Sequence, residues 1–217
     1  MYIEVIEMFV KSIMIPRHHC ITAEPKETLR SALKKLEDHQ IDGMPIVDGD
    51  SYEGMVTRYH IYEKNFLSNT QKDEFLDSTF VQDIATHKDI FLVVDEVFEK
   101  TLLELKDFPL LAVVDEKRKF IGIMTRADVL EQFESAFGLN RPGVRIAFTS
   151  VETEGRIARL SDIAHQFQVH IISLVTFDET DKLVRRIVMK IEKNNHVDRF
   201  IKKLEEHGFR ILSVKED

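Results

Sequence analysis

The sequence of 217 residues predicts an α+β protein, in which two copies of one mixed α/β half-domain precede a domain of another kind. One observation is a duplicated motif, which reads GMVTRYH from Gly54 and GIMTRAD from Gly122. Another is the C-terminal third, where strand and helix patterns follow each other in the order βαββαβ. A repeated pattern that is followed by a different order of strands and helices indicates a paired module and a separate C-terminal domain.

The two copies, residues 20–63 and 89–131, follow one order of elements. Each has a short apolar run, an acid-rich amphipathic helix, a strand ending in Val-Asp, a charged turn, a strand ending in Thr-Arg, and a second helix. The first helix is clearest in the first copy, where helical spacing joins Leu29, Ala32, Leu33 and Leu36. The strands predict two hairpins, 44–48 with 54–57 and 111–115 with 122–125.

The last third begins with a strand pattern from Val144, and Gly155 opens a helix with one apolar face. Two strands at 171–177 and 183–192, a helix at 196–207 and a final strand follow. This order predicts a four-stranded antiparallel sheet with both helices on one face.

Turn-forming residues set the predicted boundaries. Residues 68–73 are polar and indicate a surface connection, and glycine and proline gather in 137–143. The predicted divisions are a first repeat at 1–67, a linker at 68–80, a second repeat at 81–138, a hinge at 139–143 and a C-terminal domain at 144–217.

The composition, 43% hydrophobic and 31% charged, is typical of a globular protein. The net charge of −8 argues against general nucleic-acid binding. A single cysteine, Cys20, excludes an intrachain disulfide framework and suits a reducing compartment. The chain starts without the basic region of a signal peptide, and its apolar runs are too short to span a membrane. We therefore expect a cytoplasmic protein that binds neither nucleic acid nor membrane.

The duplicated motif resembles the Gly-h-x-Thr/Ser-x-x-Asp/Asn signature of CBS domains, where h is an apolar residue. MPIVD (44–48) and LAVVD (111–115) stand where that family has its h-P-V-V-D strand. The last third resembles an ACT domain, with Gly155 at the strand–helix turn and His-Ile-Ile at 170–172. The whole order resembles AcuB-type and cyclic-di-AMP-binding CBS proteins. The resemblance implies a pseudo-twofold module of two CBS repeats over residues 8–137, followed by a ferredoxin-like ACT domain.

Thr125 ends a predicted strand where it would cap the next helix, with Asp128 in the first turn. One interpretation is structural, because both side chains suit the free N–H groups and the dipole at a helix start. It leaves Arg126 unexplained, since a cation there is mildly unfavourable. The repetition of the pair at Thr57 and Arg58 favours a nucleotide instead. Phosphate oxygens would meet the hydroxyl, the N–H groups and the arginine, and the carboxylate would accept both ribose hydroxyls.

The resemblance also implies that adenosine lies between apolar strand residues of the repeats. Matched position by position, the first-strand pocket residues would be Ile21, Thr22, Ala23, Ile90, Phe91 and Leu92. The next segment would add Leu110, Leu111 and Ala112, or Gly43, Met44 and Pro45. Most of these would be core residues in any protein of this fold.

His60 departs from the family pattern, because it replaces the acidic residue in the first repeat. An imidazole cannot accept two hydroxyls, and hydrogen bonds to a charged group contribute about 1.5–3 kcal/mol. We therefore predict one dominant nucleotide site per chain, built on Asp128. The first site is either degenerate or meets a phosphate or a second base.

Two further candidates are weaker. His18, His19 and Cys20 are adjacent, but adjacent ligands point different ways and no fourth ligand is evident, so no metal site is predicted. The turn at Glu154, Gly155 and Arg156 lies where ACT domains bind amino acids, usually across a dimer interface. Glycine also occurs at such turns for conformational reasons alone.

No nucleophile, Walker loop or paired carboxylates stand out, so we expect a regulatory protein and not an enzyme. The expected ligand is an adenine nucleotide, either cyclic di-AMP or AMP, ADP or ATP, with no other cofactor. A homodimer and a regulated protein partner are expected. The alternatives are a constitutive dimeric scaffold and an amino-acid sensor with a vestigial nucleotide cleft.

Overall fold

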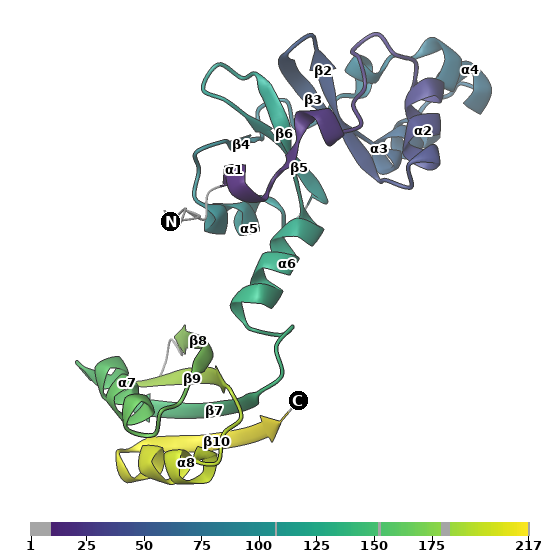
Figure 1. Ribbon diagram of the computed structural model, residues 1–217. Coiled ribbons are helices and arrows are strands. Elements are labelled where there is room, and N and C mark those ends of the chain that lie inside the picture. The colour runs from purple at the N-terminus through teal and green to yellow at the C-terminus, as the bar shows by residue number, and fades with distance from the viewer. Residues whose placement is uncertain (1–9, 107, 152, 179–182, 217) are drawn as a thin grey trace. The chain divides into compact units, whose positions relative to one another are not determined.

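The computed structural model describes residues 10–106, 108–151, 153–178 and 183–216 (Figure 1). The chain divides into two compact units, and the division falls between Leu130 and Glu131. The first unit holds both copies of the duplicated motif, and the second holds the βαββαβ segment. Each unit is described by itself.

The first repeat is built as the periodicity predicts. Helix α2 (Leu29–Asp38) buries its apolar stripe, and Thr28 caps it by accepting a hydrogen bond from the Ser31 amide. Strands β2 (Gly43–Asp48) and β3 (Ser51–Thr57) form an antiparallel hairpin, and α3 (Arg58–Leu67) follows directly. The hairpin turn is shorter than predicted, because β3 already begins at Ser51 and not at Gly54.

The predicted linker at 68–80 is not a free surface connection. It contains helix α4 (Lys72–Ser78), and the short 3-10 helix η2 (Val81–Ile84) follows. Phe75 and Leu76 of α4 lie in the core of the first repeat, together with α2. The polar residues 68–73 favoured the prediction of a surface connection. The burial of Phe75 and Leu76 instead holds the segment against the core of the first repeat.

The second repeat has the same order with a shorter first helix. After β4 (Leu92–Val93) come only the 3-10 helix η3 (Phe98–Lys100) and α5 (Thr101–Glu104), whereas the sequence predicted a full amphipathic helix. Pro109 follows closely, and a proline disfavours helical backbone at the residue before it. Strands β5 (Leu110–Val114) and β6 (Phe120–Thr125) form the second hairpin, and α6 (Arg126–Ala136) follows.

Each repeat receives a strand segment from the stretch that precedes the other repeat. After α1 (Val10–Ile13), strand β1 (Ile15–Pro16) pairs with β6, and the 3-10 helix η1 (Arg17–His19) follows. Thr86, which precedes the second repeat, pairs with Met55 of β3. The motif glycines permit these approaches, since a Cβ at Gly122 would overlap the Ile15 carbonyl and a Cβ at Gly54 would lie 2.8 Å from the Thr86 carbonyl.

The second unit has the predicted element order. It consists of β7 (Val144–Val151), α7 (Arg156–Gln166), β8 (Ile171–Asp178), β9 (Val184–Ile191), α8 (Val197–Glu206) and β10 (Phe209–Glu216). The four strands pair antiparallel in the order β10-β7-β9-β8. Both helices pack in one apolar cluster with the strands, so they cover the same face of the sheet.

The predicted hinge at 139–143 is fastened to this sheet. The Ser173 hydroxyl donates to the Phe137 carbonyl at 3.0 Å, and the buried Lys190 ammonium donates to the Gly138 carbonyl at 3.0 Å. Arg141 forms an ion pair with Glu192. These contacts place the residues after α6 within the second unit, and they explain why the division falls inside α6, earlier than predicted.

Candidate functional site

Thr125 and Asp128 form a closed capping pair at the start of α6. The Thr125 hydroxyl and amide donate to the same oxygen, Asp128 Oδ2, at 2.6 and 2.8 Å. In return, the Asp128 amide donates to the Thr125 hydroxyl at 3.2 Å. Among the described residues these side-chain bonds use one carboxylate oxygen only. Oδ1 of this half-buried carboxylate is therefore available to accept hydrogen bonds from a ligand.

His60 holds the equivalent place in the first repeat. Thr57 Oγ1 lies 2.7 Å from His60 Nδ1 and accepts from the His60 amide at 3.2 Å. The capping geometry thus survives the exchange of a carboxylate for an imidazole. Burial lowers the pKa of His60, so the ring is neutral at pH 7 and has only Nε2 left for a ligand.

The arginine of each motif has a structural role that the sequence did not reveal. Arg58 and Arg126 each open a helix, yet their guanidinium groups turn back to carbonyls at the end of the first helix of the same repeat. The acceptors are Leu36 and Ile41 for Arg58, at 2.7 and 3.0 Å, and Leu105 and Lys106 for Arg126, both at 3.2 Å. A cation is favourable at a helix C-terminus. The predicted phosphate contact would require these bonds to break.

The strand residues predicted for the pocket divide into core and accessible residues. Ala23, Leu111 and Ala112 are fully buried. Ile21 packs against the core of the first repeat, and Phe91 packs edge-on against Tyr52. Ile90, by contrast, is 43% exposed. Leu92, Leu110 and Met44 are buried as well, so the core alone accounts for six of the candidate positions.

Thr22 lines a cavity of about 590 Å³ in the first unit, together with Arg17, Cys20 and Lys26. Arg17 is held there by Asp50 and by the Gly49 carbonyl. Burial raises the pKa of Cys20 to about 11, so its thiol is protonated at neutral pH. Within the ranges that the structure describes, no three His, Cys, Asp or Glu side chains are grouped as metal ligands.

Two residues beside His60 were missed in the sequence. His87 and Phe108 stack with their ring centroids 3.8 Å apart, and Phe108 lies 6.2 Å from the ring of His60. His87 and Phe108 both lie beyond residue 67, where the first repeat was predicted to end. The sequence around His60 therefore could not indicate that they are its neighbours.

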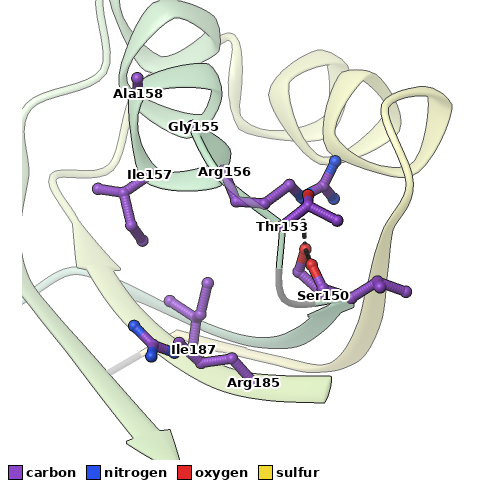
Figure 2. A pocket seen from close by; sticks show the side chains of 9 residues that line it. Ser150, Thr153, Gly155, Arg156, Ile157, Ala158, Arg185 and Ile187 are labelled. Carbon is purple, nitrogen blue, oxygen red and sulfur yellow. Dashed lines mark hydrogen bonds between the residues drawn. The ribbon is translucent and has the colours of Figure 1, made fainter. Parts of the chain in front are cut away.

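The turn at Gly155 in the second unit borders a cavity of about 170 Å³, which Ser150, Arg185 and Ile187 also line (Figure 2). Gly155 has φ of 79°, and a Cβ there would meet nothing within 4 Å, so backbone conformation alone accounts for the glycine. Glu154 is exposed.

Arg156 is structural in the same way as Arg58 and Arg126. Its guanidinium donates to the Ser150 hydroxyl at 2.6 Å and to the carbonyls of His207 and Gly208 at 3.1 and 3.0 Å. It also lies 4.1 Å from the ring centroid of Phe209. Arg156 thus caps the end of α8, and the predicted ligand contact would require these bonds to break.

The comparison with protein families covers both repeats, since residues 10–65 and 81–135 each match the CBS domain. The chain belongs to the CBS-domain family. An inosine-5'-monophosphate dehydrogenase of Methanocaldococcus jannaschii is 31% identical over 116 residues, which are 52% of this chain and 21% of that protein. The chain spans between about a fifth and two fifths of the curated relatives it matches.

Solved structures agree with the CBS fold. The crystal structure of CBSX2 in complex with AMP is 27% identical, with a TM-score of 0.50 over 61% of this chain and 98% of that one. The structure of CbpB in complex with c-di-AMP is 16% identical, with a TM-score of 0.53 over 59% of this chain and 86% of that one. In the described part of the CBS protein, no helix is long and apolar enough to cross a membrane.

Proposed function

We propose that this CBS pair binds an adenine nucleotide at Asp128 and that the protein is regulatory, without catalysis of its own. The observation that carries the proposal is the Thr125–Asp128 pair, which fixes the carboxylate through Oδ2 and leaves Oδ1 to accept a ribose hydroxyl. The AMP complex of CBSX2 supports this ligand class. Cyclic di-AMP and AMP, ADP or ATP are the candidates.

The phosphate would be met by the positive end of the α6 dipole and not by the Arg126 guanidinium. The amides of Thr125, Arg126 and Asp128 already donate to Asp128, Pro109 and Thr125, so the helix dipole is what favours an anion there. Arg126 is already bound to the carbonyls of Leu105 and Lys106.

Regulation would follow from linkage between ligand and conformation. A nucleotide that contacts both repeats favours the arrangement that binds it best, and a protein partner reads that arrangement. A homodimer is part of this proposal, as is an ACT-like role for the second unit in pairing subunits.

A second candidate function is amino-acid sensing by the second unit. The cavity beside Gly155, with Arg185 at its wall, is the observation that favours it. Since Arg156 is bound to the carbonyls of His207 and Gly208 and Arg185 forms an ion pair with Asp178, an amino-acid carboxylate would be met by the start of α7.

Titration calorimetry with AMP and with cyclic di-AMP tests the nucleotide site. Asp128→Asn keeps an amide oxygen that can cap α6 but replaces the free acceptor by a donor. We expect its affinity to fall roughly ten- to a hundred-fold, the effect of about 1.5–3 kcal/mol. Arg126→Gln should lower stability and leave affinity within about threefold, which would correspond to less than 1 kcal/mol.

Unchanged affinity in Asp128→Asn would refute the assignment of the ribose contact. A thermal-shift panel of adenine nucleotides distinguishes nucleotide binding from the alternative of a constitutive scaffold. A ligand at a hundred times its dissociation constant adds about 2.7 kcal/mol to the free energy of unfolding. If no adenine nucleotide shifts the melting temperature, the scaffold is favoured. A shift with free amino acids alone would favour the sensor.

A further inference from the structure

The two helix starts of the CBS pair differ in what lies against them. At the first, the side chain of Phe108 is 7% exposed and belongs to a cluster with Val47, Tyr52 and Met55 of the first repeat. Phe108 itself precedes β5 of the second repeat, so it reaches across the pair. Its ring lies 6.2 Å from the ring of His60, inclined by 31°.

His87 completes this arrangement. Its ring stacks on Phe108 at 3.8 Å and 30°. The backbone of His87 has φ of 55°, an uncommon conformation for a residue other than glycine. The Tyr52 hydroxyl holds it by donating to the His87 carbonyl at 2.8 Å, and Thr86 Oγ1 lies 3.1 Å from Nδ1. The ring of His87 is therefore fixed over Phe108 from several sides.

No such ring projects from the matching position of the first repeat. The register pairs Gly43 with Thr57 and Leu110 with Thr125, so Ile41 corresponds to Phe108. Ile41 packs against the core of its own repeat, and its carbonyl is bound by Arg58. The two repeats therefore differ in two ways. One has His60 where the other has Asp128, and Phe108 lies beside His60 whereas its counterpart Ile41 packs in the core of its own repeat.

We propose that the His87–Phe108 stack closes the cleft beside Thr57 and His60, so that this chain offers an adenine nucleotide one site and not two. The inference rests on the proposed nucleotide function and names the residues that set its stoichiometry. Bases bind to proteins by stacking on aromatic and apolar side chains. Two rings whose centroids are 3.8 Å apart leave no room for a base between them, and the ring of Phe108 lies beside that of His60 at 6.2 Å, where a base stacked on His60 would have to enter.

Native mass spectrometry and calorimetry with AMP test this on three variants. Phe108→Ala removes the ring. His87→Gly removes the other half of the stack and suits the positive φ, so it keeps the fold if Phe108→Ala does not. Ile41→Ala is the matched control at the corresponding position. We expect one AMP per chain in the wild type and in Ile41→Ala, and two in the other variants. The second AMP should bind roughly ten- to a hundred-fold more weakly, since His60 cannot accept two hydroxyls.

A ligand-free measurement separates this inference from the proposed function. Burial lowers the pKa of His60, and burial followed by the charge of His60 lowers that of His87. Glu63 raises the pKa of His60 and Lys64 lowers it, and both remain in the variants. NMR titration should show the pKa of His60 rising toward its ordinary value in Phe108→Ala and in His87→Gly.

The outcomes are distinct. If the wild type binds one AMP and neither stack variant binds a second, the inference is overturned while the nucleotide function stands. An unchanged pKa of His60 in both stack variants would also overturn it, because the stack would then not cover that ring. If no protein binds AMP although the pKa rises, the nucleotide function fails and the single-site inference fails with it.

Discussion

At the scale of single residues, three arginines share one role. Arg58, Arg126 and Arg156 each occupy the first position of a helix, and each binds carbonyls at the end of another helix. The sequence placed Arg58 and Arg126 in a ligand site because an arginine at a helix start has no local explanation, and the resemblance to ACT domains placed Arg156 in one. Their acceptors lie 22, 21 and 51 positions away along the chain, a separation that no local pattern reveals.

Arg156→Leu should lower the free energy of unfolding of the second unit by about 1.5–3 kcal/mol, the contribution of hydrogen bonds to a charged group. Urea denaturation, followed by amide signals of β7 and β10, measures the change. Arg159→Leu is the matched control, because Arg159 is exposed on the same helix and its loss should stay within about 0.5 kcal/mol. Equal effects of the two substitutions would contradict the capping role.

At the scale of elements, periodicity predicted most of the fold. Helix α2, both hairpins and all six elements of the second unit lie where apolar spacing and turn residues indicated. The exceptions have tertiary causes. Helix α4 packs on the first repeat because Phe75 and Leu76 lie in its core, and the residues just before the predicted hinge are held to the sheet because Ser173 and Lys190 bind the carbonyls of Phe137 and Gly138. Turn-rich composition predicts a break in a helix, but it cannot show whether the break is free to bend.

Gly138→Ala tests that attachment. Gly138 has φ of 65°, and an added Cβ would overlap the Ile172 side chain. Gly155→Ala is the matched control, because Gly155 also has a positive φ but has open space around its Cβ position. The control should cost about 1–2 kcal/mol, the cost of left-handed backbone. Gly138→Ala should cost more and should speed hydrogen exchange in β8 and β9; equal costs would show that the segment is not clamped.

At the scale of the whole molecule, the CBS pair could be predicted from the sequence, whereas the side chains that surround His60 could not. The repeat and its signature could be read from the chain, since both copies keep their glycine and threonine. The asymmetry of the clefts was only half visible, because His60 is in the motif whereas Phe108 and His87 approach from other segments. Contacts between repeats depend on how two halves meet, which neither half encodes alone.

The expected homodimer is argued at the same scale. Helix α3 exposes Tyr59, Tyr62, Phe66 and Leu67, with Phe66 87% exposed. Large apolar side chains gathered on one helix favour a protein interface. Phe66→Glu should therefore shift the protein from dimer to monomer in sedimentation velocity, whereas Leu103→Glu, at another exposed apolar position, should leave the dimer intact. A wild-type monomer at micromolar concentration would contradict the prediction.

The strand segments around Ile15 and Thr86, which pair across the two repeats, also constrain how the chain folds during synthesis. Ile15 leaves the ribosome early, but its partner Ile123 follows only after nearly all of both repeats. Thr86 likewise joins a hairpin that was synthesised before it. The N-terminal strand must therefore wait unpaired while more than a hundred residues emerge, the span that separates Ile15 from Ile123. Such long-range pairing slows folding, so the N-terminal strand stays unpaired until the second repeat has been translated.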